Sequence, residues 1–330
     1  MSASLPTRAL WVVAALAVPL CAATASAWTA LGVADDPLVR LPGTQPADGV
    51  VLEGPGQCMN CHDNYDPNVD VGFHWRGSMM AQALRDPLFW ASVTVAAQDS
   101  IWAVGRPNAA DLCLRCHTPE GWLGGRSDPS NGSGFTGSDH DGVSCAGCHK
   151  LYDPFFEDTY TGVREGSDWV GYWDESGASS TPSAAAALTT WTADGIEAST
   201  VEFFNGNGFY DGSNQPVSPG WTDHGGGQYF ASSTAERRAS FADANANHGQ
   251  LYSRHHKSRY FCASCHDVSN AVLANLAFDG TTPNDGTTVL PTESQPAYSY
   301  GHIERTFSEF MLSDYGSGPG AAGRGVFDPI

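Results

Sequence analysis

The stretch Asp111–Lys150 contains one five-residue pattern twice, as Cys113-Leu114-Arg115-Cys116-His117 and as Cys145-Ala146-Gly147-Cys148-His149. Two further copies lie outside it, at Cys58-Met59-Asn60-Cys61-His62 and at Cys262-Ala263-Ser264-Cys265-His266. This Cys-x-x-Cys-His pattern is typical of c-type haem attachment. The two thiols form thioether bonds to the porphyrin, and the adjacent histidine binds the iron from the proximal side. The sequence therefore predicts four covalently bound haems.

The number of cysteines supports the same interpretation. The chain contains nine, and the four motifs use eight of them. None of these eight is left for a disulfide, although an exported protein could form one. The alternative is a zinc protein with paired Cys-x-x-Cys sites. Zinc does not require a histidine directly after every second cysteine, whereas all four copies have one, so the pattern favours haem.

The first 27 residues have the features of an export signal. Arg8 ends a short basic region, Ala9–Ala25 is apolar and small, and Ala25-Ser26-Ala27 is a typical cleavage site. We therefore expect the mature chain to begin at Trp28 and to function in the periplasm or outside the cell. No later stretch has the length and apolarity of a membrane span.

The ninth cysteine, Cys21, lies inside this leader. It could instead be the lipid-modified cysteine of a lipoprotein. Leu20 before it is too large for a good lipoprotein signal, so the ordinary export signal is favoured.

The formal net charge is −20, with 16 Lys and Arg against 36 Asp and Glu. Such a surface is a poor partner for nucleic acid and for an anionic membrane. We expect redox partner proteins, with basic proteins and other multihaem cytochromes as the candidates. A bound divalent cation is also compatible, and Asp279–Asp285 has oxygen ligands suited to calcium. Because that segment lacks EF-hand spacing, an Asx-rich turn is favoured there.

The mature chain divides by composition. Residues 28–57 are rich in Pro and Gly and predict an extended N-terminal arm, or a tail that docks on a neighbouring subunit. Residues 58–330 form the haem domain. Within it, residues 151–239 have no cysteine and are rich in Gly, Ser, Thr and Asp, which favours a turn- and β-rich insertion.

Three helices are expected beside the motifs. Ser78 is a suitable N-cap for a short helix over 79–84. Asp86 and Pro87 have the residue types of an N-cap and a first helical position, and they predict a helix over 88–98. Residues 304–314 place Phe307, Phe310 and Met311 on one side of a third helix.

The motif histidines His62, His117, His149 and His266 are the expected proximal ligands. Each ring should be oriented by a hydrogen bond from Nδ1–H to a carbonyl or a carboxylate. Seven histidines remain for the distal side: His74, His140, His224, His248, His255, His256 and His302. The methionines of the mature chain suit packing better than ligation. We therefore expect mostly bis-histidine, low-spin haems of low potential.

Several segments together resemble the multihaem c-type cytochromes, a family that includes the tetrahaem cytochrome of ammonia-oxidising bacteria. They are His74-Trp75-Arg76-Gly77-Ser78-Met79-Met80-Ala81, Arg85-Asp86-Pro87-Leu88-Phe89-Trp90, Asp111–Pro119 with Gly121-Trp122-Leu123, Gly142-Val143-Ser144-Cys145, His256-Lys257-Ser258 leading to Cys262, Cys265–Asn270, and Glu304–Phe310. The resemblance covers most of 57–151 and 248–315. The insertion is not covered.

This resemblance implies a mainly α fold with much irregular coil, in which haems form stacked and perpendicular pairs. It favours His74 and His256 as distal ligands, followed by His248. His302 lies just before a family-like segment and His140 just before the third motif, so both remain candidates. His224 and His255 are the weakest.

Three functions fit this sequence. The first is an electron carrier, and it is favoured over a catalytic oxidoreductase because bis-histidine ligation leaves no place for a substrate. The second is a haem enzyme with one open iron that acts on a small nitrogen or sulfur compound. No basic cluster lies beside a motif to attract an anion, since Arg115 and Lys150 are expected to be isolated and solvated. The third is a subunit of an extracellular cytochrome filament, formed by self-assembly.

The spacing of the motifs also predicts their order in space. Only 28 residues separate Cys116 from Cys145. We therefore expect the second and third haems to be neighbours in the middle of the electron path, with the Cys58 and Cys262 haems at its ends.

Overall fold

The computed structural model describes residues 31–36, 41, 43–152, 186, 189–190, 192–202, 208, 211–212, 229–241, 244–253, 255–257, 260–270, 301–304 and 306–313. The chain divides into two compact units, Met1–Leu31 and Gly32–Ile330, and every element below belongs to the second. The export signal, His224, the Asp279–Asp285 segment and most of the predicted insertion lie outside the described residues.

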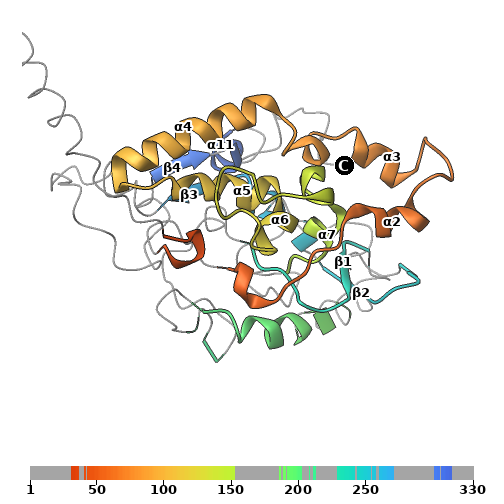
Figure 1. Ribbon diagram of the computed structural model, residues 1–330. Helices are drawn as coiled ribbons and strands as arrows, with labels where there is room; N and C mark the ends of the chain where they lie inside the picture. The colour runs from red at the N-terminus through yellow and green to blue at the C-terminus, as the bar shows by residue number, and fades with distance from the viewer. Residues whose placement is uncertain are drawn as a thin grey trace, which may run out of the picture. The chain divides into compact units, whose positions relative to one another are not determined.

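Short helices joined by irregular chain make up most of the described structure (Figure 1). The α-helices are α2 (Pro55–His62), α3 (Val71–Arg76), α4 (Pro87–Val104), α5 (Asp111–His117), α6 (Pro119–Leu123), α7 (Cys145–His149), α9 (Tyr260–Ala263) and α11 (Thr306–Leu312). The 3-10 helices are η1 (Val33–Asp35), η2 (Pro46–Asp48), η3 (Met80–Gln82), η4 (Asn108–Ala110), η5 (Gly137–Asp141) and η6 (His255–Lys257).

The strands are short and form two pairs. Strand β1 (Arg237–Ala239) runs parallel to β2 (Gln250–Tyr252), with Arg238 opposite Leu251. Strand β3 (Val268–Asn270) runs antiparallel to β4 (Gly301–Glu304). Each pair directly adjoins a histidine-bearing segment, because β2 leads into η6 and β3 follows the fourth Cys-x-x-Cys-His motif.

Helix α4 begins where the sequence predicts and extends further than predicted. The Asp86 carboxylate accepts a hydrogen bond from the Leu88 amide at 2.8 Å, and Pro87 occupies the first turn. The helix continues to Val104 and ends at Gly105, whose φ of 82° is a left-handed conformation that suits glycine. The other two predicted helices are shorter than expected: η3 replaces 79–84, and α11 spans Thr306–Leu312.

The described part of the predicted N-terminal arm is packed against the region of the Cys-x-x-Cys-His motifs. Leu41, Val50 and Leu52 are buried, and Val50 and Leu52 belong to the main apolar cluster. Thr44 binds the segment that begins at Tyr229, because the Ala231 amide donates to Thr44 Oγ1 at 2.8 Å. These residues are therefore part of the core, and they do not project from it.

The predicted insertion contains a helix that its composition did not indicate. Residues 192–198 are helical, although a turn- and β-rich segment was expected. Strand β1 at the end of the same region is the main β-element described there. The helix matters for the site, because its side chains contact β1.

Candidate functional site

Each of the first three motifs lies at the end of a short helix. In α2, α5 and α7 the motif histidine is the last helical residue. The two cysteines and the histidine occupy positions i, i+3 and i+4, which lie on one face of a helix. In the fourth motif, α9 ends at Ala263 and a turn continues to His266. One helical turn thus presents two thiols and an imidazole together, as thioether attachment requires.

The thiols of different motifs meet in space. All eight cysteines of the four motifs are free thiols. Cys58 lies beside Cys145, and Cys116 lies beside Cys265, close enough for the two thiols of each pair to shift each other's pKa. Cys148 is close enough to Cys262 to interact with it electrostatically. The four motifs therefore converge, although they are spread over more than 200 residues of sequence.

This arrangement gives the motifs a spatial order of first, third, fourth and second. The cysteines of the Cys262 motif lie near both central motifs and so are not at an end of this order, while the order of the haems themselves stays a prediction. The first motif, at Cys58, lies next to the third motif, which is consistent with a place at one end of this order. His117 and His266 also interact electrostatically, which places the second motif beside the fourth.

The pairing makes the two thiols of each pair chemically different. The contact with Cys145 lowers the pKa of Cys58 to about 6. The same contact raises the pKa of Cys145, and burial raises it further. In the second pair, the contact lowers the pKa of Cys116 and raises that of Cys265. Burial, reinforced by neighbouring acidic groups, raises the pKa of Cys113 to about 11, and burial together with the nearby Cys262 raises the pKa of Cys148 to about 11.

Two of the predicted proximal histidines have the orienting hydrogen bond that the sequence predicts. His117 Nδ1 lies 2.9 Å from the Ala83 carbonyl oxygen, and His149 Nδ1 lies 2.7 Å from the Arg238 carbonyl oxygen. Both contacts place the proton on Nδ1 and leave Nε2 as the metal-binding atom. The His117 ring also stacks on Phe89, with ring centroids 3.8 Å apart. Burial lowers the pKa of His117 and so favours the neutral imidazole that binds iron.

Two of the candidate distal histidines face a motif histidine. The ring centroids of His62 and His248 are 6.5 Å apart with planes at 54°, and those of His149 and His256 are 6.1 Å apart with planes at 13°. Two imidazoles on opposite sides of one metal have centroids about 6 Å apart, since each metal–nitrogen bond takes about 2 Å and each ring adds about 1 Å. Both separations match that value.

His256 is held at both ring nitrogens. Nδ1 lies 2.9 Å from Ser253 Oγ, and Nε2 lies 3.0 Å from the Cys148 carbonyl oxygen. Ligation through Nε2 would replace the contact with Cys148, while the contact with Ser253 would continue to orient the ring. Burial and the neighbouring His255 lower the pKa of His256 well below its usual value, which favours the neutral form.

The other candidates have different surroundings. His74 is exposed, with Nε2 3.2 Å from the Asn68 carbonyl oxygen. His140 is exposed in η5. His302 is opposite Ser269 in the β3–β4 pair, and Ser269 lies three residues after the end of the fourth motif. His255 is buried beside His256 and Phe261. The structure thus brings His248 and His256 to motif histidines, whereas the resemblance favoured His74 over His248.

The expectation that Arg115 and Lys150 are solvated is wrong. Arg115 is 1% exposed, lies between the rings of Trp122 and Tyr229, and donates to the Leu41 carbonyl. Lys150 is 3% exposed and donates to the Val51 carbonyl at 2.8 Å. Arg115 lies within the second Cys-x-x-Cys-His motif, and Lys150 directly follows the third. Residues of the N-terminal segment cover both side chains through tertiary contacts. A local sequence pattern cannot show such contacts.

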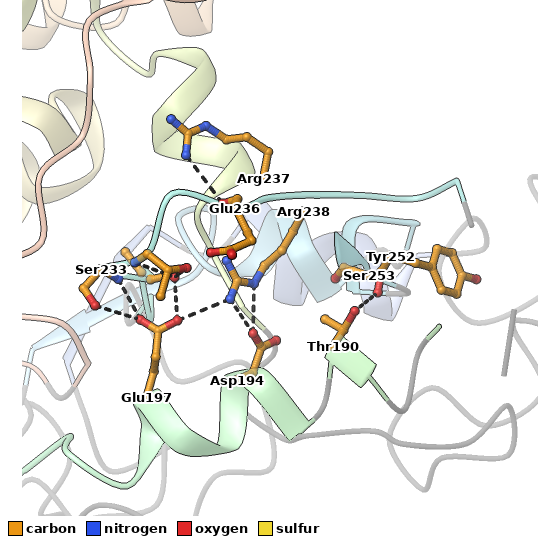
Figure 2. Close-up of polar contacts among 12 residues, drawn as sticks. Thr190, Asp194, Glu197, Ser233, Glu236, Arg237, Arg238, Tyr252 and Ser253 are labelled. Atoms are coloured by element: carbon orange, nitrogen blue, oxygen red, sulfur yellow. Dashed lines mark hydrogen bonds and ion pairs between the residues drawn. The ribbon is translucent and has the colours of Figure 1, made fainter. Parts of the chain in front are cut away.

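A buried polar cluster beside His149 was not anticipated from the sequence (Figure 2). Its centre is Arg238, which is fully buried and ion-paired with Asp194 and Glu197. The only sequence signal is the pair Arg237-Arg238 in a chain with few basic residues. The partners of Arg238 are about 40 residues away, so no local pattern joins them.

Comparisons with family models, with curated proteins and with solved structures return no match for this chain. Within the described ranges, no helix is long and apolar enough to cross a membrane. In the same ranges, no three His, Cys, Asp or Glu side chains gather into a group that could hold a free metal ion.

Proposed function

We propose that this chain is an exported tetrahaem c-type cytochrome that carries electrons along covalently bound haems. One observation carries the proposal most strongly, namely the convergence of four Cys-x-x-Cys-His motifs through their own thiols. Cys58 and Cys145 are 87 residues apart in sequence, and Cys116 and Cys265 are 149 residues apart. Tertiary folding that gathers attachment sites in this way suits cofactors that must exchange electrons at short range.

The residues present fit c-type haem. Each motif offers two free thiols and one imidazole from a single turn of chain. His117 and His149 direct Nδ1 at a backbone carbonyl and leave Nε2 available. Haem iron, when bound, cycles between its ferric and ferrous states, and the protein sets its potential through ligands and surroundings. The roles of this chain are therefore attachment, ligand orientation and spacing.

An electron carrier is favoured over an enzyme by the two facing histidine pairs. His62 with His248, and His149 with His256, are close enough that each pair would hold one haem iron between its two imidazoles. An iron held by two imidazoles would have no position left for a substrate. The acidic composition, with 36 Asp and Glu against 16 Lys and Arg, suits a basic redox partner in the periplasm or outside the cell.

The proposal is tested by producing the chain in a host that attaches c-type haem. The intact mass of the denatured protein should correspond to four haems, and the reduced spectrum should contain only low-spin haem that binds no carbon monoxide. A protein without covalent haem would overturn the proposal. One equivalent of high-spin haem that takes up carbon monoxide would instead support the enzyme with an open iron. Sedimentation as large polymers in place of monomers would support the filament subunit.

A further inference from the structure

Three side chains of the segment 190–197 bind the strand pair β1–β2 (Figure 2). Thr190 Oγ1 donates to the Tyr252 carbonyl of β2 at 2.5 Å. Asp194 accepts from Arg238 Nε of β1 at 2.9 Å, and Glu197 accepts from Arg238 Nη2 at 3.4 Å. Positions i, i+4 and i+7 share one face of a helix. The helical segment therefore contacts both strands with one face, and we call these three residues the clasp.

The contacts of Thr190 and Asp194 are buried, and that of Glu197 is partly buried. Arg238 is 0% exposed, Asp194 is 3% exposed and Thr190 is 5% exposed. Glu197 also accepts a hydrogen bond from the Ser233 amide at 2.7 Å, so its carboxylate bridges β1 and the chain that leads into it. Charge-assisted hydrogen bonds of this kind impose directional geometry. Removal of one buried partner leaves the other charge uncompensated, so the cluster resists displacement.

The two clasped strands control the two rings of one histidine pair. The Arg238 carbonyl of β1 accepts the hydrogen bond of His149 Nδ1 at 2.7 Å. Strand β2 continues through Ser253, whose hydroxyl contacts His256 Nδ1 at 2.9 Å. The Ser253 amide also donates to the Ala239 carbonyl at 2.8 Å, which joins the ends of both strands. The spacing of His149 and His256 thus depends on how β1 and β2 are held together.

We propose that Thr190, Asp194 and Glu197 are positioning residues that fix the separation and the relative ring planes of His149 and His256, the two imidazoles that would hold one haem iron. The clasp acts on β1 through the Arg238 side chain and on β2 through the Tyr252 carbonyl. This inference rests on the proposed haem function and goes beyond it, since the clasp lies in the region that the family resemblance does not cover.

The angle between the two rings supplies a spectroscopic test. The planes of His149 and His256 differ by 13°, whereas those of His62 and His248 differ by 54°. In low-spin ferric haem, near-parallel and strongly tilted axial imidazoles give distinct electron paramagnetic resonance signals. The His149–His256 haem should therefore contribute its own near-parallel component to the spectrum of the four-haem protein, and the variant His256→Ala should remove that component.

The experiment compares clasp variants of the haem-loaded protein with a control on the same strand. The double variant Asp194→Asn with Glu197→Gln, and the milder variant Thr190→Val, should retain four haems while the near-parallel component shifts or broadens. Arg238→Lys, which keeps the charge, should change that component less than Arg238→Gln. The control Arg237→Gln removes a neighbouring guanidinium that pairs with Glu53, and it should leave the component unchanged.

The outcomes separate this inference from the proposed function. Wild-type protein without covalent haem would overturn the proposed function itself. Four haems with a near-parallel component that survives His256→Ala would overturn the pairing of His149 with His256, and the clasp inference with it. Four haems with an unchanged near-parallel component in Thr190→Val and in the double variant would overturn the clasp inference alone. If the double variant does not fold, Thr190→Val decides.

Discussion

The motif helices and the clasp position their functional groups in different ways. In α2, α5 and α7, two thiols and an imidazole come from five consecutive residues. In the clasp, Arg238 meets Asp194 across 44 positions of sequence and Thr190 meets Tyr252 across 62. The difference teaches that local sequence places the two thiols and the imidazole of each motif, whereas long-range contacts decide how the histidine rings are oriented. Variants of the motif cysteines should therefore lose covalent haem, whereas variants of the clasp should retain the haems and change the orientation of the histidine rings.

The largest effect is expected from loss of one attachment site. Replacement of both thiols of the third motif, Cys145→Ser with Cys148→Ser, should reduce the covalent haem content from four to three, because thioether bonds need the cysteine sulfur. The intact mass of the denatured protein measures this content. The control Ser144→Ala removes the hydroxyl that accepts from the Gly147 amide and should retain four haems, at a cost of about 1 kcal/mol in stability. Four haems in the double variant would contradict the assignment.

The buried ion pairs of Arg238 should have the next largest effect. Arg238→Met leaves the buried Asp194 carboxylate without the Arg238 guanidinium, which costs about 3–5 kcal/mol in the free energy of unfolding. The haem number should stay at four, in contrast to the cysteine variant. Denaturant titration of the haem-loaded protein measures the loss. Arg237→Met, whose ion pair with Glu53 is partly exposed, should cost about 1 kcal/mol or less, and an equal loss in both variants would contradict the role of burial.

The motif region should also show a pH dependence that the clasp does not explain. Burial raises the pKa of Asp111 from 3.8 to about 6, although Trp122 Nε1 donates to this carboxylate at 2.7 Å. Since the folded pKa exceeds the unfolded one, the folded state binds more protons between about pH 4 and pH 6. Stability should therefore decrease as the pH rises through that window, by on the order of 2 kcal/mol.

Asp111→Asn tests this pH dependence. The amide keeps an acceptor for Trp122 and cannot ionise, so the decrease between pH 4 and pH 6 should become smaller in the variant. The measurement is the unfolding midpoint at several pH values. An identical pH profile for both proteins would show that another group is responsible.

The smallest effect is expected at Ser253. Ser253→Ala removes the hydroxyl beside His256 Nδ1 and should cost about 1 kcal/mol in stability. The near-parallel resonance component should broaden while all four haems stay attached and low-spin. Ser264→Ala, a buried serine within the fourth motif, is a matched control for loss of a hydroxyl. A change of haem content in Ser253→Ala would contradict the expectation that this residue orients a histidine ring and has no part in haem attachment.

Several features of the fold were accessible from sequence because their causes are local. Asp86 and Pro87 predicted the start of α4, since capping depends on adjacent residues. The predicted end at residue 98 was too early, because Asp99–Val104 contain no stop signal and the helix continues to the left-handed Gly105. The helix at 192–198 was missed because the region around it is rich in small polar residues, and its stability comes from the contacts of Asp194 and Glu197 with Arg238.

The site divides along the same line. The sequence by itself determined the four Cys-x-x-Cys-His motifs and predicted their roles in haem attachment, because five adjacent residues contain that chemistry. Only the tertiary structure decided which motifs are neighbours, which histidines face His62 and His149, and that Arg115, Lys150 and Arg238 are buried. The physical reason is that burial and orientation depend on contacts between residues far apart in the chain. No short pattern encodes such contacts, even where it encodes the bond to the cofactor.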